Sequence, residues 1–172
     1  QITVAGRLIH DHHRFGVLTI ADALAQSSNV GAIKLGLLVG NASMYEYIRR
    51  LGFGARTGID LTGESPGILH ALNRWQPSSI GSIAIGQEIA VTPLQMVTAY
   101  SVIANGGMLV KPHLVRELRS PEGVVLFQAN PEARRALKPE TTAALRNMFE
   151  DVTLRGTARK AQLNGYTAAG KT

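Results

Sequence analysis

The sequence predicts a mixed α and β fold that is mostly helical, with one β-hairpin and one strand near the C-terminal end. Three observations lead to this fold class. Several stretches repeat apolar residues at helical spacing, begin at a capping residue and stop near glycine. A Ser-Pro-Glu-Gly turn separates two apolar runs, which is typical of a hairpin. The 172 residues are 45% hydrophobic and contain no internal repeat, so they suffice for one core.

Two helices are expected near the N-terminus, joined by a short polar elbow. Thr19 can cap a first helix that runs to Gln26, and Asp22 lies favourably in its first turn. Ser27-Ser28-Asn29 interrupts this helix, and the apolar stretch of residues 30–39 then has helical spacing again. An elbow of this kind projects short polar side chains into a cleft.

The next segments are a third helix and a long irregular region. Residues 42–51 predict a helix that ends at Gly52, since glycine commonly follows the last helical turn. Residues 53–86 are rich in Gly, Pro and Ser, and we expect long ordered loops there. Loops of this length are unusual in a compact domain and are often functional.

A strong helix start follows at Thr92. Threonine caps the helix, Pro93 occupies its first position, and Gln95 can close a capping box. The helix is expected to end at residues 105–107, Asn-Gly-Gly. Its expected apolar face consists of Leu94, Val97, Tyr100, Ser101 and Ala104.

The C-terminal part predicts a hairpin, a helix and a strand. Residues 108–118 and 124–127 flank the turn that begins at Ser120, with Ser, Pro and Gly in favoured turn positions. Pro139 opens a helix that continues to about residue 154. Residues 166–169 predict a strand that delivers the last two residues, although the chain offers few partner strands for it.

Composition narrows the functional classes. The net charge of +6 suits an anionic partner, but the basic residues are scattered and few aromatic residues lie between them, so nucleic-acid binding is not favoured. The absence of cysteine excludes disulfides and thiol nucleophiles. No apolar run approaches the roughly 18 residues of a membrane span. No signal peptide is visible either.

Several isolated features have plain structural interpretations. His10, Asp11, His12 and His13 fit no regular zinc spacing and predict a solvated loop, so no metal and no cofactor are expected. Trp75 is compatible with lining a groove or with simple packing, and these alternatives stay open.

The most informative pattern pairs Ser27-Ser28-Asn29 with Lys171-Thr172. Ser-x-Asn followed by Lys-Thr furnishes the active site in one family of acyl-transferring serine enzymes. Ser-x-Asn alone is most often a helix cap or a turn. Residues 165–172 also satisfy Gly-x-x-x-x-Gly-Lys-Thr, the phosphate-binding P-loop. The preceding residues make a poor buried strand, so the nucleotide-binding alternative is disfavoured.

Several ordered blocks together resemble a known family. They are Asp22 to Gly31 (DALAQSSNVG), Gly52 to Gly54 (GFG), Ile85 to Gln95 (IGQEIAVTPLQ), Ile103 to Gly107 (IANGG) and Gly156 to Thr172, which contains GTA and ends in NGYTAAGKT. From about Val17 onward the chain resembles penicillin-binding protein transpeptidase domains, in particular the class B, division-type enzymes. The resemblance implies an α/β fold in which a helical subdomain packs beside a central antiparallel sheet. Many relatives have Gly where this chain has Glu88, which leaves the local loop shape open.

The resemblance also implies chemistry: D,D-transpeptidation, which cross-links peptidoglycan stem peptides, and covalent inhibition by β-lactams. Ser27 would relay a proton, and Asn29 would orient the substrate carbonyl and the catalytic lysine. Ser28 would face away. Lys171 would face the substrate carboxylate, and Thr172 would donate a hydroxyl hydrogen bond to it.

The serine nucleophile is expected outside this sequence. The family's Ser-x-x-Lys pair is absent here and should lie upstream of Gln1, and a Gly should follow Thr172. Residues 1–172 are therefore expected to form part of a transpeptidase domain, without most of the central sheet, and to be inactive alone. A non-catalytic piece is the remaining alternative. The parent would be extracytoplasmic, membrane-anchored through another segment, and in contact with cell-division proteins.

Overall fold

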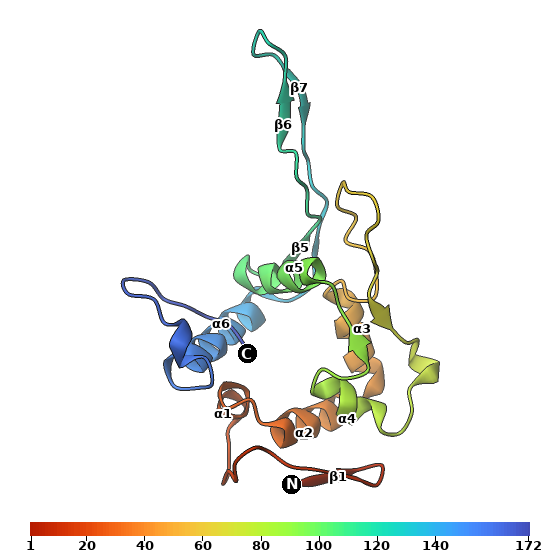
Figure 1. Cartoon of the computed structure of the whole chain (residues 1–172), viewed down its shortest axis with the longest axis vertical. Helices are drawn as coiled ribbons and strands as arrows, with labels where there is room; N and C mark the ends of the chain where they lie inside the picture. Colours follow the sequence, from red (N-terminus) through yellow and green to blue (C-terminus); the bar gives the residue numbers. More distant parts are fainter.

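The computed structural model describes residues 1–172. Six α-helices and two short 3-10 helices alternate with four separate two-stranded antiparallel sheets. Figure 1 shows an open arrangement in which the helices curve around the middle of the molecule and one hairpin projects far from it. None of the helices combines the length and the apolar character needed to cross a bilayer.

The N-terminal part contains the predicted elbow. Strands β1 (Ile2–Val4) and β2 (Arg7–Ile9), which the sequence did not predict, form a small hairpin. Helix α1 (Ile20–Ala25) is capped by Thr19 as predicted, and Asp22 completes a capping box with it that the sequence did not predict. Helix α2 (Asn29–Val39) begins directly after the elbow and is capped by the Ser28 side chain. The two predicted helices are thus present at the predicted places.

The long loop prediction for residues 53–86 is wrong in part. Helix α3 (Asn41–Arg50) ends as predicted, and Gly52 adopts a left-handed φ of 95°. The following region then contains strand β3 (Ile68–Leu69), the 3-10 helix η1 (Leu72–Arg74) and helix α4 (Ser79–Ala84). Helix α4 packs against α2, and five of its six residues are buried. Six residues are too few to display a helical period, so burial rather than pattern defines this helix.

Helix α5 (Pro93–Ala104) begins with the predicted capping box, but the predicted apolar face is wrong. Its buried residues are Gln95, Ala99 and Val102, whereas Val97 is 63% exposed. The helix is apolar nearly all round, so hydropathy does not select a face. Gln95 can be buried because its amide donates to the carbonyl oxygens of Ala55 and Pro66, each at 2.8 Å.

The predicted hairpin is shorter than expected. Strand β6 (Glu117–Arg119) pairs with β7 (Val125–Gln128) around the predicted turn, and this ribbon projects from the body in Figure 1. Strand β5 (Met108–Val110) instead pairs with β8 (Ala133–Arg135), which the sequence did not predict. The remaining short strand, β4 (Ile89–Ala90), pairs with β3.

Helix α6 (Pro139–Leu154) is the longest element and confirms the predicted range. It packs against both α1 and α5, and Phe149 stacks on Tyr100 with ring centroids 5.7 Å apart. The main apolar cluster centres on Val102, Ala136 and Leu137. The 3-10 helix η2 (Arg159–Ala161) follows α6.

The predicted terminal strand is wrong. Residues 166–169 form no ladder, and only an isolated bridge joins Leu163 to Tyr166. No neighbouring strand lies beside this segment to pair with it. Instead the segment lies along α6: the Thr153 hydroxyl donates to the Ala168 carbonyl at 2.6 Å, and the Gly170 N–H donates to the Phe149 carbonyl at 3.2 Å.

Candidate active site

The elbow between α1 and α2 presents Ser27 on an unusual backbone. Ser27 has a φ of 55°, in the left-handed region that non-glycine residues rarely adopt. Two backbone hydrogen bonds hold this turn: Ser27 N–H to the Leu24 carbonyl at 3.1 Å, and Ser28 N–H to the Ala23 carbonyl at 2.9 Å. As a result, the Ser27 side chain is exposed while the Ser28 side chain is buried.

The structure brings the two sequence motifs together. The Lys171 ammonium group donates to the Ser27 hydroxyl at 2.6 Å, across 144 residues of sequence, and to the Thr172 carbonyl at 2.7 Å. Burial lowers the pKa of Lys171, because removing the ammonium group from water disfavours its charge. The Thr172 hydroxyl lies 2.6 Å from the Thr157 hydroxyl.

Asn29 and Ser27 line one small cavity of about 370 Å³ beside the elbow, together with Asp11, His12, His13, Phe15, Gln26 and Thr157. The Asn29 amide makes no hydrogen bond within the chain, so its donors and acceptor are available to a ligand. Lys171 and Thr172 do not line this cavity themselves but meet two residues that do, Ser27 and Thr157. All four predicted site residues therefore gather at one place.

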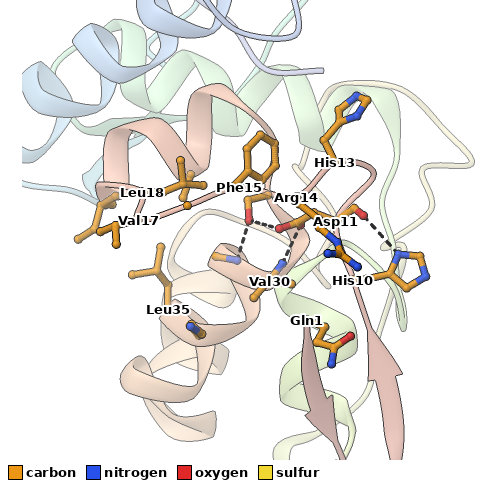
Figure 2. A pocket seen from close by; sticks show the side chains of 16 residues that line it. Gln1, His10, Asp11, His13, Arg14, Phe15, Val17, Leu18, Val30 and Leu35 are labelled. Atoms are coloured by element: carbon orange, nitrogen blue, oxygen red, sulfur yellow. Dashed lines mark hydrogen bonds between the residues drawn. The ribbon is translucent and has the colours of Figure 1, made fainter.

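Asp11 stabilises the elbow through hydrogen bonds to Ser28 and Val30, a role that the sequence did not reveal. Its carboxylate accepts from the Ser28 hydroxyl at 2.9 Å and from the Val30 N–H at 3.1 Å, as Figure 2 shows for Val30. Ser28 also accepts from the Gly31 N–H at 2.9 Å. Ser28 thus bonds to Asp11 and not to Lys171. No three His, Asp or Glu side chains of the chain converge as metal ligands.

A larger cavity of about 790 Å³, whose lining Figure 2 shows, shares Asp11, His13 and Phe15 with the smaller one and is also lined by Val17 and Leu35. Lys34 also lines this cavity rather than the smaller one, and the Ser27 hydroxyl bonds to Lys171 instead.

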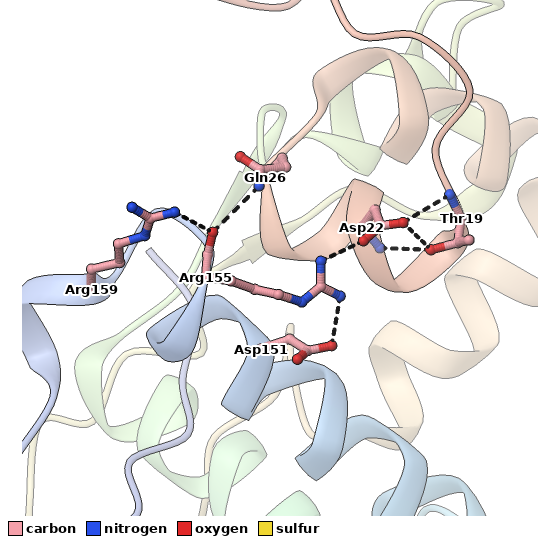
Figure 3. A network of polar contacts seen from close by, with 6 residues as sticks. All are labelled: Thr19, Asp22, Gln26, Asp151, Arg155 and Arg159. Carbon is pink, nitrogen blue, oxygen red and sulfur yellow. Dashed lines mark hydrogen bonds and ion pairs between the residues drawn. The ribbon is translucent and has the colours of Figure 1, made fainter.

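An ionic network ties the segment after α6 to α1 (Figure 3). The Arg155 guanidinium donates to Asp22 at 2.5 Å and to Asp151 at 2.8 Å. Hydrogen bonds from Thr19 and then from Arg155 lower the pKa of the Asp22 carboxyl, and the Arg155 hydrogen bond lowers that of Asp151. The Arg155 carbonyl in turn accepts from the Gln26 amide at 3.5 Å.

The remaining sequence candidates lie apart from this site. Trp75 donates its indole N–H to the His70 carbonyl at 3.1 Å and meets Tyr45 edge-on, which supports packing over a groove role. Glu88 adopts a left-handed φ of 60°, a backbone conformation that glycine adopts more readily than any other residue. Residues 162–167 are exposed and preceded by no buried strand, so a P-loop is not supported.

Comparison with known proteins identifies the class. Residues 4–172 match the family model described as the penicillin binding protein transpeptidase domain. The chain belongs to this family. It is 37% identical to penicillin-binding protein PbpB of Mycolicibacterium smegmatis, covering all of this chain and 28% of that protein. It is also 37% identical to stage V sporulation protein D of Bacillus subtilis, covering 91% of this chain and 25% of that protein.

Solved structures agree with the sequence relatives. Penicillin-binding protein 3 of Mycobacterium tuberculosis, complexed with aztreonam, matches 99% of this chain and 40% of that chain, with a TM-score of 0.90 and 33% identity. The same protein complexed with ampicillin gives a TM-score of 0.91. The predicted transpeptidase fold is confirmed, and the chain spans about a quarter of the length of these curated relatives.

Proposed function

We propose that this chain is part of a serine-type peptidoglycan D,D-transpeptidase that cross-links stem peptides through a covalent acyl-enzyme. The observation that carries the proposal is the 2.6 Å hydrogen bond from Lys171 to Ser27. It joins a Ser-x-Asn elbow to a Lys-Thr pair in a chain that belongs to the penicillin-binding protein transpeptidase family.

Each of the four residues has a proposed task. Ser27 relays a proton between the nucleophile's lysine partner and the leaving amine, because its hydroxyl can donate and accept at the same time. Asn29 directs its free amide at the substrate's peptide carbonyl. Lys171 places its positive charge opposite the substrate carboxylate, and Thr172 donates a hydrogen bond to the same group. The partly buried position of Lys171 strengthens this attraction, since water screens it less.

The nucleophile in this proposal is a serine outside residues 1–172. No serine of this chain is followed by lysine three positions later, and a serine hydroxyl needs such a neighbouring base for attack. Residues 1–172 therefore act as part of a transpeptidase domain, supplying the groups that orient the substrate and move the proton.

β-Lactams are proposed as covalent inhibitors of the parent protein, in keeping with the aztreonam and ampicillin complexes of the mycobacterial relative. Because the proposed substrate is peptidoglycan, we propose that the parent protein acts outside the cytoplasm and has a membrane anchor in another segment. Contacts with cell-division proteins are proposed from the resemblance to division-type enzymes. No cofactor is required for acyl transfer to serine.

The test uses the full-length protein that carries this segment and a fluorescent penicillin. The wild type should label at one equivalent, on a serine outside residues 1–172 as located by mass spectrometry. Ser27→Ala should acylate about 100-fold more slowly, because positioned proton transfer contributes roughly 10²–10⁴-fold. Asn29→Ala should also acylate more slowly, because the substrate carbonyl loses the amide that orients it. Ser43→Ala, an exposed serine on α3, is the matched control and should label normally. Wild-type rates in both elbow variants, or a label on this chain, would refute the proposal.

A further inference from the structure

Thr157 is a residue at this site to which the sequence assigned no task. Its hydroxyl lies 2.6 Å from that of Thr172, and its backbone N–H donates to the Ala25 carbonyl at 3.2 Å. Thr157 also lines the 370 Å³ cavity with Ser27 and Asn29. Thr157 thus contacts the end of α1 and Thr172, and it also lines the cavity beside the elbow.

The position of Thr157 is fixed relative to the elbow by its two preceding residues. Arg155 joins α1 through Asp22, as Figure 3 shows, and its carbonyl accepts from Gln26. At Gly156 a side chain would approach the Ala25 carbonyl far inside normal contact, so this close passage requires glycine. The backbone that carries the Thr157 hydroxyl is therefore held against Ala25, two residues before Ser27.

The two threonine hydroxyls form one hydrogen bond, in which one is the donor and the other the acceptor. Each hydroxyl has a single proton. A carboxylate accepts hydrogen bonds but donates none, so Thr172 can serve a carboxylate only if its own proton points at the ligand. Thr172 must then be the acceptor in its bond with Thr157. Lys171 does not donate to the Thr172 hydroxyl, because its hydrogen bonds go to the Thr172 carbonyl and to the Ser27 hydroxyl.

We propose that Thr157 is a positioning residue that donates its hydroxyl proton to Thr172 and so directs the Thr172 proton to the carboxylate of the substrate or the β-lactam. This inference rests on the proposed function of the site. It makes Thr157 a determinant of specificity for ligands with a free carboxylate. Hydrogen bonds to a carboxylate are roughly twice as strong as neutral ones, so an esterified ligand gains less from the arrangement.

The test measures acylation rate constants of the full-length protein with benzylpenicillin and with its methyl ester. Thr157→Val keeps the branched shape but removes the hydroxyl. It should lower the rate with the free acid about tenfold, because the Thr172 proton is then no longer directed at the carboxylate. The rate with the ester should change by less than about twofold. Thr157→Ser should restore the acid rate, since serine keeps the hydroxyl.

Two further variants separate positioning from general damage. Thr167→Val removes an exposed hydroxyl that makes no hydrogen bond in the chain and should leave both rates unchanged. Thr157→Val combined with Thr172→Val should be no slower than Thr172→Val alone, because Thr157 acts through Thr172. Thr157→Ala provides the same acid-to-ester comparison should the valine variant fail to fold.

The outcomes are distinct. A wild type that is not acylated at all would overturn the proposed function of the site. An acylated wild type whose Thr157→Val rate is unchanged would overturn the inference about Thr157. Equal loss with acid and ester, or a Thr157→Ser variant as slow as Thr157→Val, would also overturn it.

Discussion

Gly156→Ala should damage the site from a position outside it. A β-carbon at Gly156 would lie 2.9 Å from the Ala25 carbonyl carbon and 2.9 Å from the Val152 α-carbon, and closer still to the Ala25 oxygen. All of these atoms belong to backbone, so no flexible side chain can yield. Overpacking of this kind costs about 1–3 kcal/mol. Loss of the Thr157 N–H bond to Ala25 adds about 1 kcal/mol.

The assay compares thermal unfolding and penicillin acylation of the full-length protein. A loss of about 2–4 kcal/mol corresponds to roughly 4–16 °C in the midpoint for a domain of this size. Acylation should fall as well at a temperature where the variant is folded, because α1 and the Thr157 segment must separate. Gly16→Ala is the matched control, since its β-carbon would meet nothing within 4 Å. Equal midpoints and equal acylation for the two variants would refute the close-packing argument.

Three other perturbations test the supports of the site. Asp11→Asn weakens two hydrogen bonds to the start of α2, so it should lower the free energy of unfolding in urea by about 1.5–3 kcal/mol and slow acylation. The control is Asp60→Asn, which should acylate normally, because the Asp60 carboxylate accepts from a loop away from the site. Gln95→Leu leaves two loop carbonyls without a donor and should lower the free energy of unfolding by about 2–4 kcal/mol. Met96→Leu, at the exposed position next to it, should lower it by less than about 1.5 kcal/mol. Equal losses in the two variants would contradict the role of the Gln95 amide. Asp22 and Asp151, the two aspartates bonded to Arg155, have lowered pKa values, so their ionised forms stabilise the folded state at pH values above about 3.9, the ordinary pKa of aspartate. This stabilisation should be lost as the pH falls through the lowered pKa values. An Arg155→Met variant with the same acid unfolding curve as the wild type would refute the network's contribution.

Local chemistry allowed much of the fold to be predicted from sequence. Helices α1, α5 and α6 begin at capping or proline signals that act within four residues, so their starts were predictable. The turn at Ser120 is equally local. Strand β8 was not predictable, because its Ala-Arg-Arg sequence carries no strand pattern and depends on pairing with β5.

The prediction of a strand at residues 166–169 was wrong for a related reason. Tyr166 and the residues after it have a strand-like composition, but a strand requires a neighbour to accept its hydrogen bonds. Here the carbonyl of Ala168 finds the Thr153 hydroxyl on α6 instead. The buried face of α5 could not be predicted either, since burial of Gln95 depends on two carbonyls that lie 29 and 40 residues earlier.

The four site residues were predicted from family resemblance, and their supports were not. Asp11, Arg155 and Thr157 are common residue types whose importance lies in contacts across 15 to 133 residues of sequence. Charge pairs and hydroxyl pairs at such separations leave no local pattern. Gly156 stands just after α6, where glycine is common, but its close constraint is the Ala25 carbonyl.

The backbone at Ser27 explains why these supports are needed. A left-handed conformation costs a non-glycine residue roughly 1–2 kcal/mol, and glycine would avoid that cost but lacks the hydroxyl that Lys171 contacts. Such strain persists only where the surroundings over-determine the backbone. The turn bonds of Ser27 and Ser28 and the two bonds to Asp11 supply about 1 kcal/mol or more each. The elbow is therefore held by its neighbours, and Ser-x-Asn becomes a site only where they are present.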